Sequence, residues 1–152
     1  IEAMIKDGPN TREKVTQIAL ALNCRSRALV DPDEYRKIFN DVNYVQPSIY
    51  VPVVETALHY DIVTPLRGFF EPNKIATRSE SFAMIMSATC LYNRVPWEEV
   101  WQPRLYNEAF VLGITDRTWE NFDRNGNVST EDLLSIVRRV INKASVTGGC
   151  GQ

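Results

Sequence analysis

The chain has 152 residues, of which 44% are hydrophobic, 24% charged and 10% aromatic, and its formal net charge is −2. This composition is that of an ordinary globular protein and excludes wholesale disorder. The basic residues form no stripe, which argues against a nucleic-acid binder, and no apolar run approaches the roughly 20 residues that span a bilayer. Because the chain begins with Ile and shows no signal peptide, we expect a mature form or a piece of a longer protein, so export remains compatible with the sequence.

Helix signals alternate with loops along the first sixty residues. A helix is predicted over 11–23, because Thr11 can cap its first turn and apolar residues follow at helical spacing. A capping box with Pro32 at the first helical position predicts a short helix over 31–40. After a loop, apolar residues predict a third helix over 50–60.

The second half continues the alternation. Proline and glycine break the chain over 61–74, and we expect Phe69 and Phe70, with Phe122 as their counterpart, to hold the long loops against the core. A short helical turn is expected over 115–119. Another helix is predicted to begin at Thr77. A further helix is expected from Trp97 to Leu112, where Gly113 stops it, and the last from Ser129 to about Lys143.

The same order of residue types occurs more than once. A shift of 52 residues aligns 57–90 with 109–142 without a gap, and a shift of 66 aligns Thr11-Arg12 with Thr77-Arg78. A fixed period of this size is typical of repeat architectures, in which each unit is too small to bury a core alone. The sequence therefore predicts an all-α fold built from helix–loop–helix repeats.

Three cysteines leave two interpretations open. Cys24 and Cys90 each stand thirteen residues after the Thr of their Thr-Arg pair, whereas Cys150 lies in a Gly-rich tail. The first two are either buried small apolar residues at the ends of equivalent helices or the halves of a disulfide in an oxidising compartment. With one histidine, His59, and no C-x-x-C spacing, a Cys/His zinc site is not expected.

The most specific motif begins at Phe69 and reads F-F-E-P-N-K-I-A-T-R-S-E-S-F. It resembles the end of an S-layer homology repeat, which has the form G-x-F-x-P-x-x-x-x-T-R-A-E followed by an apolar helix. The residues that match this form are Gly68, Phe70, Pro72, Thr77, Arg78 and Glu80.

Weaker matches lie on either side of this motif. F-N-D-V at 39–42 is similar to the opening of such repeats, and L-G-I-T at 112–115 to the end of their first helix. T-R-E at 11–13 marks another repeat, whereas Thr130 stands where the family has Arg. Since only ten residues precede Thr11, the first helix of that repeat cannot be present at full length. We expect that the chain is cut from a larger protein or that a partner replaces this helix.

The resemblance implies a pseudo-trimeric helical bundle. Its parts would be an incomplete first repeat (1–24), a connector (25–38), a second repeat (39–94), a third repeat (95–145) and a flexible Gly-rich tail (146–152).

The resemblance further implies an exported, non-enzymatic module of the bacterial cell surface that binds a secondary cell-wall polysaccharide in the grooves between repeats. Arginine at the start of a helix suits a carboxylate-bearing glycan, because its guanidinium fork adds to the positive end of the helix dipole. Trp97, Trp101 or Tyr106 could stack on a sugar ring. The alternative is that the Thr-Arg-x-Glu residues are a cap and a solvated first turn, and that the aromatics are core. The candidate glycan-binding residues are Arg78, Arg12, Thr77, Glu80, Asp41, Lys74 and Trp101.

A second pattern suggests calcium. Asp123, Asn125 and Asn127 occupy the first, third and fifth positions of a loop that reaches Asp132 at the tenth. A calcium loop of the EF-hand type needs twelve positions, with Gly at the sixth and an acid at the twelfth, so two residues are missing and the usual cage cannot close. The same residues serve as well as a turn followed by a helix cap.

Enzyme chemistry finds little support, and no cofactor is expected. His59 is the lone histidine, and no serine or cysteine stands in a recognisable nucleophile motif. The alternative to glycan anchoring is a protein–protein assembly module of a surface layer or of a larger exported complex. The shortened first repeat and Thr130 favour that alternative.

Overall fold

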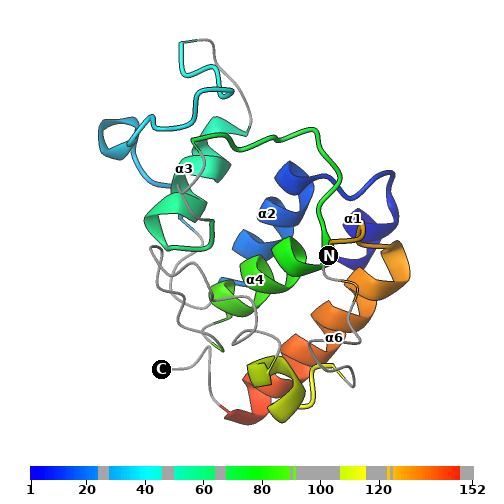
Figure 1. Ribbon diagram of the computed structural model, residues 1–152. Coiled ribbons are helices and arrows are strands. Elements are labelled where there is room, and N and C mark those ends of the chain that lie inside the picture. Colours follow the sequence, from blue (N-terminus) through cyan, green and yellow to red (C-terminus); the bar gives the residue numbers. More distant parts are fainter. Residues whose placement is uncertain are drawn as a thin grey trace.

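The computed structural model describes residues 1–23, 28–45, 50–63, 68–89, 91, 107–115, 123 and 125–147. These ranges are mostly helical and hold no strand, so the expected all-α class is confirmed for them (Figure 1). The elements are α1 (Glu2–Lys6), α2 (Arg12–Ala21), the 3-10 helix η1 (Pro32–Glu34), α3 (Val51–His59), α4 (Arg78–Ala88) and α6 (Thr130–Thr147), with a further helical segment at 107–111. None of the helices in the described ranges is long and apolar enough to cross a membrane.

Three helices begin at their predicted caps. The hydroxyl of Thr11 accepts from the Lys14 N–H (3.2 Å), that of Thr77 from the Glu80 N–H (3.1 Å), and that of Ser129 from the Asp132 N–H (3.0 Å). Each hydroxyl thus satisfies one of the donors that a helix start leaves unpaired. Thr11, Thr77 and Ser129 are also the three residues that the shifts of 66 and 52 relate to one another.

The helix predicted over 31–40 is wrong in length. It is confined to η1, and Asp31 makes no side-chain cap hydrogen bond. The backbone after η1 binds the carboxylate of Glu55 instead of continuing a helix. This carboxylate accepts from the N–H groups of Arg36 (2.9 Å) and Lys37 (3.0 Å). Lys37 adopts a left-handed backbone with φ of 54°, which a right-handed helix does not allow.

Other predicted elements differ less. α3 and α4 lie where they were expected, and Gly113, with φ of 76°, follows the 107–111 helix as the predicted stop. α6 extends to Thr147, four residues beyond the predicted end. Phe70 is buried as expected, whereas Phe69 is 53% exposed and does not hold the loop. Residues 97–106, 116–119 and Phe122 lie outside the described residues, as do the three cysteines.

α4 is the central helix of the described core. Figure 1 shows it between α2 and α6, and both of these helices pack against it. Its apolar residues are joined in the interior by Ser79, Ser81 and Ser87, so the helix is buried around nearly its whole circumference. The largest fully buried side chains of the described core are Phe70, Phe82, Ile5, Ile18, Leu58, Ile62, Ile85, Met86, Ile114 and Leu133.

The short helix α1 takes part in this core. It has five residues where α3 has nine, and its Ile5 side chain is fully buried. α3 packs against α2, the long helix of the first repeat, and α1 packs against α6, the long helix of the third. α1 thus packs on α6 as α3 packs on α2. The sequence suggested that the first helix of the first repeat was missing or replaced by a partner, and α1 is a short helix in that place.

Candidate functional site at the repeat junctions

Two junctions between repeats are built by the same backbone hydrogen bonds. In the first, Arg12 N donates to the Lys74 carbonyl (2.8 Å) and Ala76 N to the Asn10 carbonyl (3.0 Å). In the second, Arg78 N donates to the Gly126 carbonyl and Val128 N to the Ala76 carbonyl, both at 2.9 Å. The donors and acceptors of the second junction follow from those of the first by the shifts of 66 and 52. The period found in the sequence thus recurs in the hydrogen bonding.

Each junction also joins an arginine to a carboxylate of the next repeat. At the first junction, Arg12 forms an ion pair with Glu80, and its Nε donates to the Phe70 carbonyl (2.6 Å). The guanidinium lies 5.4 Å from the centre of the Phe70 ring, and the side chain is 17% exposed. These contacts fix the plane of the guanidinium, because a ring, a carbonyl and a carboxylate each restrain it.

The second junction repeats this pairing but leaves one partner in solvent. Arg78 Nε donates to Asp132 Oδ2 (2.9 Å), and Nη1 donates to Asp123 Oδ2 (3.2 Å). The Asp132 side chain is 25% exposed and that of Asp123 is 73% exposed. Burial raises the pKa of Asp132, but hydrogen bonds from Ser129 and Arg78 outweigh it and leave this pKa below its ordinary value.

Gly126 provides the space for this arrangement. A Cβ added at Gly126 would collide with Arg78 Nη1 and with Asp123 Oδ2. Its carbonyl also accepts the hydrogen bond from Arg78 N. From the sequence, this segment was interpreted as a calcium loop or a turn, because a glycine in a sequence gives no sign of which side chain will occupy the space above it.

The third junction, between the third and first repeats, is different. Among the described residues, 8–10 and 128–130 form none of the backbone hydrogen bonds that the shifts would predict. Thr130 replaces the arginine, and Lys14 stands at the position of the carboxylates Glu80 and Asp132. Between these two described segments, Asn10 Nδ2 instead donates to Thr130 Oγ1 at a long distance of 3.5 Å.

Lys14 explains why this junction is not formed like the others. Its ammonium donates to the carbonyls of Asp7 (2.8 Å), Ile5 (3.3 Å) and Gly8 (3.3 Å). The Gly8 carbonyl is the acceptor that the shifts would assign to the N–H of Thr130. Lys14 therefore ties the first loop to its own repeat, and burial lowers the pKa of its ammonium.

The remaining predicted residues support the loops. The two carboxylate oxygens of Asp41 accept from the N–H groups of Phe70 (2.8 Å) and Glu71 (2.7 Å), so Asp41 positions the carbonyl that Arg12 contacts. Lys74 lies at the first junction, through its carbonyl, and its ammonium stands 3.5 Å from Glu71. Thr77 caps α4 and donates to Glu80 Oε1 (2.9 Å). Trp101 lies outside the described residues.

The residues of the calcium pattern gather around a cation of the chain itself. Asp123 and Asp132 both bind Arg78, and Asn125 and Asn127 are exposed. Within the described residues, no three side chains of His, Cys, Asp or Glu come together in a way that could hold a metal ion.

Buried Glu55 is a structural residue that sequence reasoning did not single out. The residue is 2% exposed within an apolar helix, and its carboxylate binds two backbone N–H groups. Nearby, burial together with the charge of Glu55 raises the pKa of Tyr44 to about 12. The only available signal was a carboxylate on the apolar face of the helix predicted over 50–60.

The chain matches no protein-family model, no curated protein and no solved structure.

Proposed function

We propose that the chain is an S-layer-homology-type module that anchors an exported protein to a secondary cell-wall polysaccharide of the bacterial cell surface, without catalysing a reaction. The observation that carries the proposal is the recurrence of one junction, with a capped helix start and an Arg–carboxylate pair, at the shifts of 66 and 52. It supports the motif resemblance, because a repeated motif and a repeated contact occur at the same residues.

The second junction is the proposed binding site. Arg78 is held at Nε by Asp132, which is largely covered, and at Nη1 by Asp123, which is 73% exposed. An exposed ion pair contributes little stability, so a ligand carboxylate can displace Asp123 at small cost. The ligand would then meet a guanidinium whose orientation Asp132 already sets.

The first junction is a weaker candidate. Arg12 is covered by Phe70 and paired with Glu80, which also accepts from Thr77. Displacing Glu80 would disturb the start of α4, because Thr77, which caps that helix, donates to the same carboxylate. We therefore assign carboxylate recognition to Arg78 and a structural role to Arg12.

The test is co-sedimentation of the chain with purified cell-wall sacculi, before and after removal of the secondary polysaccharide. We expect binding to intact sacculi alone, loss of binding in Arg78→Gln and stronger binding in Asp123→Asn. The last variant keeps the Arg78–Asp132 pair and removes only the competing charge.

Arg36→Gln is the matched control, because Arg36 is an exposed arginine of the segment that follows η1. Circular dichroism would establish that each variant is folded. Equal sedimentation with stripped and intact sacculi, or unchanged binding of Arg78→Gln, would contradict glycan anchoring.

A specific observation favours a second candidate, a protein–protein assembly module of a surface layer. Both arginines already have carboxylate partners within the chain, so their first role can be to hold the repeats together. This candidate predicts that a folded chain shows no affinity for either form of the sacculi.

A further inference from the structure

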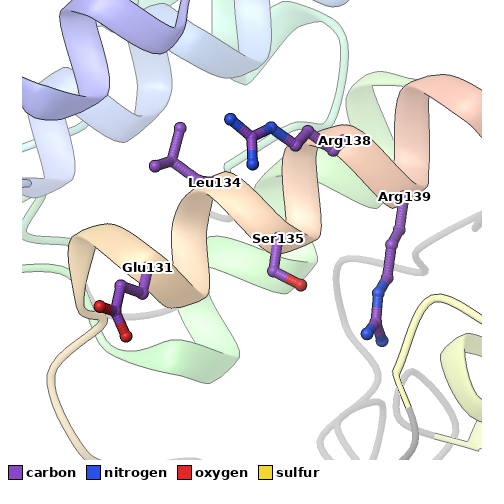
Figure 2. A pocket seen from close by; sticks show the side chains of 5 residues that line it. All are labelled: Glu131, Leu134, Ser135, Arg138 and Arg139. Carbon is purple, nitrogen blue, oxygen red and sulfur yellow. The ribbon is translucent and has the colours of Figure 1, made fainter.

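The outer face of α6 is hollowed by a depression whose lining comes from this helix alone (Figure 2). Glu131 lies at one end of it and Arg138 at the other, both exposed, with half-buried Leu134 and Ser135 between them. Arg139 completes the lining. Its guanidinium is directed elsewhere, since Nη1 donates to the Ile114 carbonyl (3.1 Å).

The order of these residues along α6 is self-complementary. A two-fold axis that passes between Leu134 and Ser135, perpendicular to the helix, exchanges Glu131 with Arg138 and Leu134 with Ser135. Two antiparallel copies of α6 would therefore place each glutamate against an arginine of the other copy. They would also place each leucine against the small side chain of a serine, where it has room to pack.

Arg138 is prepared for such a contact. Its Nε donates to Glu2 Oε1 of α1 (2.6 Å), yet 60% of the side chain remains exposed. The pair with Glu2 holds the guanidinium at the rim of the depression, so less side-chain entropy is lost when a second carboxylate approaches. Ile141, one turn further along, is 42% exposed and adds apolar surface in line with Leu134.

We propose that this face of α6 binds a second copy of the chain, with the two helices antiparallel and related by a two-fold axis. Charge complementarity selects this occupant, because the face carries one acidic and one basic end and only the antiparallel arrangement pairs both. The inference is independent of glycan anchoring, since the second junction and the α6 face use different residues.

Sedimentation velocity of the whole chain over a series of concentrations tests the proposal. We expect a monomer–dimer equilibrium that weakens with added salt, because exposed charges are screened. Glu131→Arg and Arg138→Glu should each weaken self-association by at least about tenfold, since either change creates two like-charge contacts. An equimolar mixture of the two variants should associate again, because every facing pair in the mixed dimer is then of opposite charge.

Asp33→Arg, which reverses an exposed charge of η1, is the control and should self-associate like the original chain. The mixture also separates recognition from misfolding, because two unfolded variants would not restore one another. A chain that stays monomeric at every concentration would overturn the proposal. So would a dimer that survives either reversal, or variants that remain monomeric when mixed. No glycan is present in this experiment, so such a failure would leave the anchoring function standing.

Discussion

Asp132 makes three contacts with two neighbours, Ser129 and Arg78. Its backbone N–H is capped by Ser129, while its carboxylate pairs with Arg78 and lies 3.5 Å from the Ser129 N–H. Because these contacts favour the charged form, the pKa of Asp132 is lowered despite its partial burial. One carboxylate thereby couples the start of α6 to the start of α4.

Asp132→Asn should reduce stability in a pH-dependent way. An Asp with a lowered folded-state pKa contributes stability that is fully present above its unfolded value of 3.8 and is lost as the pH falls through the folded value. The free energy of unfolding in urea, compared between the variant and the original chain, should differ at neutral pH and converge below pH 3.8. A difference that stays constant across this range would contradict the role given to the charge.

The helix caps and the arginine motifs could be predicted from the sequence, because each depends on neighbours only a few residues away. Thr11, Thr77 and Ser129 were identified as helix starts on that ground. The partners of Arg78 were not, since Asp123 and Asp132 lie about fifty residues further along the chain. Glu55 was missed for the same reason: the backbone groups that it binds belong to a segment that precedes its own helix by a loop.

The third junction differs from the first two at both positions of the arginine–carboxylate pair. Thr130 stands for an arginine and Lys14 for a carboxylate, so the attraction found at the other junctions is absent. If only residue 130 became arginine, its guanidinium would approach the ammonium of Lys14. If only residue 14 became a carboxylate, the carbonyls of Asp7 and Gly8 would lose the ammonium that they bind. The two positions should therefore be coupled.

A double-mutant cycle would measure this coupling. Thr130→Arg and Lys14→Glu should each destabilise the chain, and together they should destabilise it less than the sum of the single changes, by about 0.5–3 kcal/mol. The measurement is the free energy of unfolding in urea for the four proteins of the cycle. Additive effects would show that the third junction is too wide for the pair to form.

Element positions followed from periodicity wherever tertiary contacts agreed with it, as in α2, α3 and α4. The exception over 31–40 arose because a buried carboxylate offered the backbone better acceptors than a second helical turn would. Periodicity also could not foresee that α4 is covered on nearly every side. Serine counts as a polar residue in a sequence pattern. In α4, however, three serines are buried, and a small side chain leaves room for neighbouring helices.

For the whole molecule, the position of α4 sets the order in which its parts exchange amide hydrogens with deuterated water. α2 and α6 cover α4, and the segment before α4 is hydrogen-bonded to both neighbouring repeats. The amides of α4 therefore reach solvent only when the entire core opens. Amides on the solvent side of α6 need only a local opening. Mass spectrometry should therefore find α4 the slowest segment to take up deuterium, and the free energy measured there should equal that of global unfolding.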